Sequence, residues 1–183
     1  MAQPKEGEKF PVFPIGTPGQ PWGEAERKQW LSSQTKIRDY FADVVSRAMR
    51  YSFLDLFQYG EVDYRDRVTK TGTCAKYPLY AGRSKNWDEK KQVIVVTSGN
   101  HGYEVTEPGL FLFLDKYYTQ EFEGKANFLF LFAMCPWGYE HDHRWTPNAV
   151  DPNRSFHAKG DTEEGQLAMK CIREHDEKCA GIL

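Results

Sequence analysis

Two short apolar runs constrain the fold of this chain most strongly. Residues 93–97 read Val-Ile-Val-Val-Thr, and residues 127–134 form a second, almost wholly apolar run. A strand without polar alternation is typical of a sheet that is covered on both faces. Each run is followed by a turn that contains Gly or Pro. We therefore expect two neighbouring interior strands of one sheet, whose carboxyl ends share a crevice.

The segments around these runs predict helices and further strands. Apolar residues recur at three- and four-residue steps over 24–50, as in an amphipathic helix, and a second helix is expected over 110–118. Short strands are expected at 59–64 and 77–81. They should lie near a sheet edge, because Pro78 has no backbone N–H to donate to a neighbouring strand.

A third helix is expected near the end of the chain. Asp161, followed by Glu164, resembles a capping box, and Gly181 is placed to end the helix. Its inner face is predicted to carry Leu167, Ala168, Cys171, Ile172 and His175. The alternation of strands and helices predicts an α/β fold in which a mainly parallel, mixed sheet is flanked by helices.

The length of 183 residues suits one domain. A Pro/Gly-rich arm is expected over 1–23, followed by a folded domain over 24–183. Because another strand is expected to start at the last residues, we expect the domain to be the N-terminal portion of a larger one, truncated at its C-terminus.

Charge and hydropathy exclude several classes of partner. The net charge of -2 and pI of about 6.2 give no electrostatic footprint for nucleic acid or an acidic membrane. The longest apolar run, 128–135, is far shorter than the roughly 20 residues that span a bilayer. The N-terminus lacks the apolar stretch of a signal peptide, so a cytoplasmic location is expected. Without C-x-x-C pairs, reduced and mostly buried thiols are expected at Cys74, Cys135, Cys171 and Cys179.

The loop after the first apolar run carries His101 and Glu104, a spacing that suits two metal ligands. Gly99 and Gly102 allow a sharp turn at the carboxyl end of the expected strand, where open α/β sheets bind ligands. In the competing interpretation, this is a polar loop in which Glu104 or Thr106 caps the following helix. Placement alone does not decide between the two.

A second group of polar residues follows at Arg144 and in the tetrapeptide Asp-Pro-Asn-Arg at 151–154. Guanidinium groups match a carboxylate or a developing oxyanion, and Asn153 adds a neutral donor. The competing interpretation is an ordinary Asp-Pro-Asn turn with an arginine on the surface. The nearby Glu140, His141 and His143 are candidates for extra metal ligands, but such residues more often form a solvated loop, and they receive no role.

The two groups together resemble the zinc carboxypeptidase family, through His101-Gly-Tyr-Glu104, Arg144 and Asp151-Pro-Asn153-Arg154 in this order. The lead-in at 13–19, the Pro-Trp-Gly-Tyr turn at 136–139 and the segment 144–156 look closer still to a bacterial-type branch. The resemblance extends over most of the chain from about residue 11. It implies a zinc-carboxypeptidase-like fold.

By position, the resemblance implies that His101 and Glu104 bind Zn²⁺ and that Arg144 steadies the scissile carbonyl and its oxyanion. Asn153 and Arg154 would hold a terminal carboxylate, so the implied partner is a peptide or small amide with a free carboxylate. Zinc would lower the pKa of a bound water and polarise the carbonyl. The third zinc ligand and the general base are expected beyond Leu183. We therefore expect little peptidase activity from these 183 residues.

Two other functions fit the same residues. A non-catalytic module would use Arg144, Asn153 and Arg154 to hold a C-terminal carboxylate without metal chemistry. A deacylase of small N-acyl amino acids resembles the same family and uses similar ligands. We expect the side chains of His101, Glu104, Arg144 and Arg154 to converge on the crevice, as a site requires.

Overall fold

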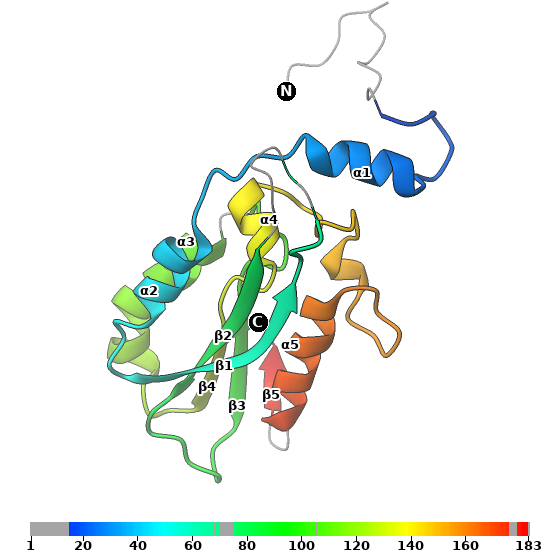
Figure 1. Ribbon diagram of the computed structural model, residues 1–183. Helices are drawn as coiled ribbons and strands as arrows, with labels where there is room; N and C mark the ends of the chain where they lie inside the picture. Colours follow the sequence, from blue (N-terminus) through cyan, green and yellow to red (C-terminus); the bar gives the residue numbers. More distant parts are fainter. Residues whose placement is uncertain (1–14, 68, 70–74, 105, 176–178, 183) are drawn as a thin grey trace, which may run out of the picture.

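The computed structural model describes residues 15–67, 69, 75–104, 106–175 and 179–182. A five-stranded sheet in the order β1-β2-β4-β3-β5 forms the centre of the protein (Figure 1). The strands are β1 (Leu54–Asp63), β2 (Lys76–Ser84), β3 (Val93–Thr97), β4 (Asn127–Leu131) and β5 (Cys179–Ile182).

The two apolar runs form β3 and β4, which pair in parallel with Val93 opposite Asn127. Both strands are interior, because β3 also pairs with β5 and β4 also pairs with β2. The prediction of neighbouring interior strands is therefore confirmed. The pairs β1–β2 and β2–β4 are antiparallel, so the mixed sheet has a larger antiparallel share than we expected.

Helices cover both faces of this sheet, which confirms the expected α/β class. In Figure 1, α2 and α3 lie on one side of the sheet and α5 lies on the other, while α1 projects from one end. The helical segments are α1 (Glu24–Ser32), η1 (Phe41–Val45), α2 (Ser46–Ala48), α3 (Thr106–Phe113), η2 (Leu114–Phe122), α4 (Pro136–His141), η3 (Pro152–Arg154) and α5 (Glu163–Glu174).

The side chains of β4 show why its sequence is apolar on both faces. Phe128 and Phe130 belong to the core cluster that contains residues of α2 and α3. Leu129 and Leu131 belong to the second cluster, which includes residues of α5. Because successive side chains of a strand point to opposite faces, every position of β4 is buried.

The single helix expected over 24–50 is wrong. α1 ends at Ser32, and the chain becomes helical again only at Tyr40. Between them, the backbone N–H groups of Ile37 and Arg38 donate to the carbonyl of Glu140, at 2.8 and 3.2 Å. A distant loop thus takes the hydrogen bonds that a continuous helix would have used.

The third helix exists, but its expected ends are wrong. Its N-cap is Thr162, whose hydroxyl accepts the N–H of Gly165 at 3.3 Å, in place of Asp161. The helix ends at Glu174, and Gly181 belongs to β5. The inner face is as predicted, with Ala168 and Cys171 buried among the side chains of the sheet.

Strands β1 and β2 are longer than the strands expected at 59–64 and 77–81, and β2 lies between β1 and β4. Only residues 81–83 of β2 pair with β4. Pro78 therefore lies in a part of β2 whose one paired strand is β1, opposite Glu61. The missing N–H of Pro78 is tolerated there, because no second strand pairs with this part of β2 within the described sheet.

The remaining expectations of the sequence are tested in part. Residues 1–14 of the expected arm, Cys74 and the side chain of Cys179 lie outside the described part of the chain. Cys135 and Cys171 are buried free thiols, as predicted. Among the described residues, no helix is long and apolar enough to cross a membrane.

Candidate functional site

The ends of β3 and β4 are joined by hydrogen bonds beyond the strands themselves. Ser98 donates its N–H to the carbonyl of Leu131 at 3.0 Å, and its own carbonyl accepts the N–H of Met134 at 3.0 Å. The carbonyl of Gly99 accepts the N–H of Cys135 at 2.8 Å. The two loops that follow the strands are therefore held side by side.

Gly102 locks the first of these loops onto α4. A Cβ atom at Gly102 would lie 1.8 Å from the nitrogen of Tyr139 and 1.9 Å from the carbonyl carbon of Gly138. Only glycine allows so close an approach of two backbones. The next residue, Tyr103, donates its N–H to the carbonyl of His143 at 3.1 Å, which brings the loop beside Arg144.

His101 lies in this loop with both ring nitrogens engaged. Its Nδ1 is 2.7 Å from Oε1 of Glu104, and its Nε2 is 2.9 Å from Oδ1 of Asp151. The residue is buried, with 4% of its surface exposed. The carboxylate of Glu104 therefore contacts the ring of His101.

Asp151 joins the two groups of polar residues. Its Oδ2 accepts a hydrogen bond from Nε of Arg144 at 3.1 Å and forms an ion pair with Nη2 of the same guanidinium at 3.0 Å. Its Oδ1, which contacts His101, also accepts the N–H of Asn153 at 2.9 Å. Partial burial alone would raise the pKa of Asp151, but the hydrogen bonds from His101, Asn153 and Arg144 outweigh it and lower the pKa below its usual value.

Arg144 is held on a second side by Tyr103. Its Nη1 donates to the phenol oxygen of Tyr103 at 3.4 Å. The hydrogen bonds to Tyr103 and Asp151 raise the pKa of the guanidinium further above its usual value. About a third of the side chain of Arg144 is exposed, so the cation is fixed in direction but still reachable.

The structure thus brings three of the predicted residues together: Asp151 contacts both His101 and Arg144, and Glu104 contacts His101. Asn153 and Arg154 follow directly in η3, but their side chains are exposed. The guanidinium of Arg154 donates to the carbonyl of Asn153 at 3.3 Å. Within the described contacts, Arg154 does not join the group around Asp151.

Asp151 lies in the tetrapeptide at 151–154, but the sequence pattern indicates no separate role for it. Asp151 is the N-cap of η3, which agrees with the interpretation of 151–153 as an ordinary turn. The missed property is its contact with a histidine fifty positions earlier in the chain. A histidine and an Asp-Pro turn that both follow interior strands would have been the only available signal.

His141 and His143 are not part of a solvated loop, contrary to expectation. The ring of His141 stacks on Trp137 with centroids 4.3 Å apart, and its Nδ1 contacts the carbonyl of Trp137 at 2.9 Å. His143 packs edge-on against Trp30. Burial lowers the pKa of both imidazoles. They belong to the aromatic packing that holds α1, and they receive no catalytic role.

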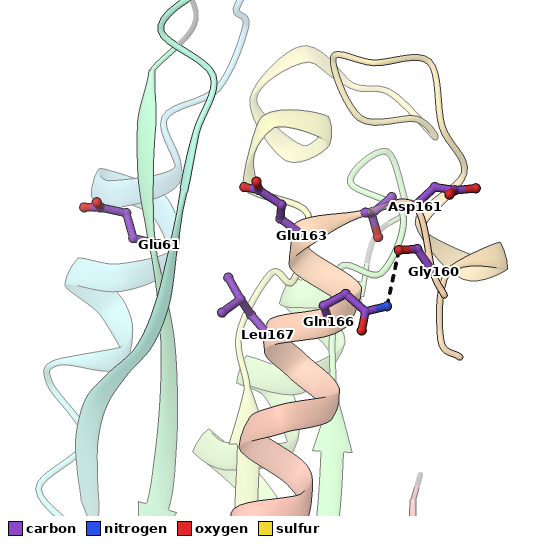
Figure 2. Close-up of a pocket in the computed structure, with 7 residues that line it drawn as sticks. Glu61, Gly160, Asp161, Glu163, Gln166 and Leu167 are labelled. Atoms are coloured by element: carbon purple, nitrogen blue, oxygen red, sulfur yellow. Dashed lines mark hydrogen bonds between the residues drawn. The ribbon is translucent and has the colours of Figure 1, made fainter. Parts of the chain in front are cut away.

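A separate hollow of about 390 Å³ lies beside the first turn of α5. Figure 2 shows that Glu61 comes from β1 across the hollow, while Asp161 and Glu163 come from the start of the helix. The three carboxylates point in different directions, so they form no common cation site. In the described part of the chain, no group of three or more His, Cys, Asp or Glu side chains is arranged to hold a metal ion.

Comparisons with known proteins support the fold. Residues 83–169 match the model of a family described as a protein of unknown function, DUF2817. This segment contains His101, Glu104, Arg144, Asn153 and Arg154. No curated protein matches the chain.

Solved structures of peptidases share the architecture. A provisionally assigned metallopeptidase from Shewanella baltica OS155 matches with a TM-score of 0.55 and 21% identity, over 72% of this chain and 47% of that one. A metallo-carboxypeptidase from Burkholderia cenocepacia matches with a TM-score of 0.54 and 12% identity, over 74% and 36%. Bovine thrombin-activatable fibrinolysis inhibitor, in complex with tick carboxypeptidase inhibitor, matches with a TM-score of 0.55 and 14% identity, over 84% and 60%.

These identities are low, and the similarity is therefore one of fold. The chain spans between 36% and 60% of the length of these three proteins. It shares the architecture of metallopeptidases and carboxypeptidases over that part.

Proposed function

We propose that this chain is the N-terminal portion of a zinc-dependent, metallocarboxypeptidase-like hydrolase that cleaves a C-terminal peptide bond or a related amide bond. One observation carries the proposal. Nδ1 of His101 and Oε1 of Glu104 lie 2.7 Å apart, while Nε2 of the same ring is held by Asp151 at 2.9 Å. Metal-binding histidines have this arrangement, with one nitrogen directed at a ligand partner and the other held by a carboxylate.

The donor set fits a zinc ion. An imidazole between two carboxylates donates to both of them only when it is cationic. A metal cation shared by Nδ1 and Glu104 would replace one of these protons, and Asp151 would keep accepting the N–H at Nε2. His101 and Glu104 would hold the ion, which would supply Lewis-acid activation of a carbonyl group. Further donors would be needed to complete the coordination.

The other residues act on the substrate. Arg144 is fixed by a hydrogen bond and an ion pair to Asp151, so it would oppose negative charge on a carbonyl oxygen without reorganising first. Asn153 and Arg154, which follow Asp151 in η3, are exposed and would receive the terminal carboxylate. The substrate would be a peptide or small amide with a free carboxylate.

Ligand binding by the 183-residue protein tests this proposal. The probe is N-benzoyl-glycyl-phenylalanine, compared with its C-terminal amide, with and without zinc. We expect the free acid to bind about tenfold or more tightly than the amide, and this preference to vanish in Arg154→Ala. Equal binding of acid and amide by the native protein would contradict the proposal.

The same experiment separates the two alternatives. A preference for the acid that is unchanged by zinc, and by His101→Ala, would indicate the non-catalytic carboxylate-binding module. Tighter zinc-dependent binding of N-acetyl-phenylalanine than of the dipeptide would indicate the deacylase.

A further inference from the structure

Two adjacent hollows are lined in part by the segment 145–150, which joins Arg144 to Asp151. The larger, of about 610 Å³, is lined by α1, by the turn after β1 and by residues 147–150. The smaller, of about 290 Å³, is lined by Trp22, Arg27, Trp145 and Ala149. Arg27 lines both hollows, and residues 145–150 contribute to both walls. They therefore form one double hollow along α1.

The walls of the double hollow combine apolar surface with cationic side chains. In the larger part, Leu31 and Pro147 are buried and Val150 is half-buried. Arg27 and Lys28, on the same helix as Leu31, are exposed. The smaller part is walled by Trp22 and Trp145, whose rings meet edge to face at 6.5 Å. Such walls suit apolar side chains that enter between cations.

The charges of the larger hollow favour an anion. It is lined by three cations, Arg27, Lys28 and Arg67, and by two acids, Glu24 and Asp66. Nε of Arg67 and Oδ1 of Asp66 form an ion pair at 3.7 Å, so these two charges offset each other. Among the described residues, neither Arg27 nor Lys28 forms an ion pair within 4 Å. With three cations and two acids, the lining has a net charge of +1, in a chain whose net charge is -2.

We propose that the double hollow binds an extended acidic peptide segment, in which Asp or Glu residues alternate with apolar ones. Carboxylates would contact Arg27 and Lys28, and apolar side chains would enter the spaces beside Leu31 and Trp145. Two hollows that share Arg27 offer an extended chain more contacts than one compact anion would use. The inference does not depend on the proposed hydrolase activity.

The proposed peptide site is connected to Arg144 and Asp151 through the chain. Residues 145–150 wall the hollow on one side and continue into both charged residues. Ala149 in this segment has a φ of 59°, a conformation that costs a non-glycine residue free energy. A bound segment would contact this constrained loop directly.

The test uses two peptides blocked at both ends, so that no terminal carboxylate is present: acetyl-Glu-Leu-Glu-Leu-Glu-amide and acetyl-Lys-Leu-Lys-Leu-Lys-amide. Binding to the full 183-residue protein is followed by calorimetry and by tryptophan fluorescence, which should respond because Trp22 and Trp145 line the smaller hollow. We expect saturable binding of the acidic peptide alone. The double substitution R27E/K28E should weaken it by about tenfold or more, because it reverses both unpaired charges.

The matched control is K116E/R173E, which reverses two exposed cations on η2 and α5 that do not line the hollows. It should leave binding unchanged, as should R154A, which removes the proposed carboxylate clamp. Circular dichroism establishes that R27E/K28E is folded, and R27Q/K28Q repeats the test without charge reversal.

Several results would overturn the proposal: no saturable binding of the acidic peptide, equal binding of both peptides, or equal losses in R27E/K28E and K116E/R173E. Full competition by millimolar inorganic phosphate would indicate a small-anion site instead. Preference for a single-stranded oligonucleotide over the acidic peptide would also contradict it. Loss of binding in R154A alone would assign the effect to the clamp.

Discussion

Among the candidate site residues, His101 is the first along the chain and Arg154 is the last, and their surroundings differ. His101 is buried, with 4% exposed, and both of its ring nitrogens are bonded to carboxylates. Arg154 is exposed, and its guanidinium donates to the carbonyl of the preceding residue. The protein thus builds the proposed metal side in advance. It leaves the proposed carboxylate side to be ordered by a ligand, which adds an entropic cost to binding.

The largest effect is expected at the loop that builds the buried side. In Gly102→Ala, the new Cβ would lie within 2 Å of the backbone of α4. We expect unfolding free energy to fall by about 3 kcal/mol or more. The control is Gly109→Ala, because a Cβ at this helical position meets nothing within 4 Å, and alanine should stabilise the helix by up to about 1 kcal/mol. Urea unfolding that finds the two variants equally stable would show that the loop is not tightly packed.

The next effect concerns a buried acid in the first turn of α5. Glu164, in the first turn of α5, is 1% exposed, and Tyr64 donates its hydroxyl to Oε1 at 2.6 Å. Burial raises the pKa of Glu164 from 4.5 to about 7. The favourable contribution of the neutral carboxyl is therefore fully present below pH 4.5 and is lost as the pH rises through about 7, at roughly 1.4 kcal/mol per pH unit.

Glu164→Gln should remove this pH dependence, because the amide does not titrate. Relative to Glu164→Gln, the native protein should lose on the order of 3 kcal/mol of unfolding free energy between pH 4.5 and 7. An exposed glutamate of η2 supplies a control, since Glu121→Gln should follow the native curve. Parallel curves for the native protein and Glu164→Gln would indicate that the carboxyl is not buried in its neutral form.

A smaller effect is expected at the residue that joins both sides. Asp151→Asn keeps the shape of the side chain but removes the charge that holds His101 and Arg144. Loss of such outer support weakens metal binding by about 10- to 100-fold. Zinc titration of Asp151→Asn, beside the exposed control Asp161→Asn, measures it. Equal zinc affinities for both variants would mean that Asp151 supports the turn and not the ligand.

The smallest effect on stability is expected at Arg154. Because the side chain is exposed, Arg154→Ala should change the free energy of unfolding by less than about 0.5 kcal/mol. The same variant is expected to lose the preference for a free carboxylate. A large loss of stability would show that Arg154 is held by the folded protein as His101 is, and the contrast between the two residues would disappear.

Local patterns predicted the parts of the fold that local interactions determine. β3 matches its predicted range of 93–97 because β-branched residues without polar alternation suit a buried strand. The break after Ser32 was not predictable, since it depends on hydrogen bonds from Ile37 and Arg38 to the distant Glu140. Hydrophobic spacing alone continues across that break.

The site shows the same division. His101 and Glu104 are three residues apart, and the turn that brings them together is visible as Gly99 and Gly102. The partner of His101 on its other side is fifty residues away, and only the packing of the loops after β3 and β4 brings it there. The sequence therefore indicated that His101 and Glu104 lie close together, but not that Asp151 contacts both His101 and Arg144.

The most direct test of the proposed metal site at His101 and Glu104 is zinc binding by the 183-residue protein, measured by titration against a metal indicator. His101→Ala is compared with His157→Ala, which removes an exposed histidine that contacts the carbonyl of Arg154. We predict that the native protein and His157→Ala bind zinc alike, and that His101→Ala and Glu104→Gln each lose about 100-fold or more in affinity. Unchanged zinc affinity in His101→Ala, or the same loss in His157→Ala, would contradict the assignment of His101 and Glu104 as the metal ligands.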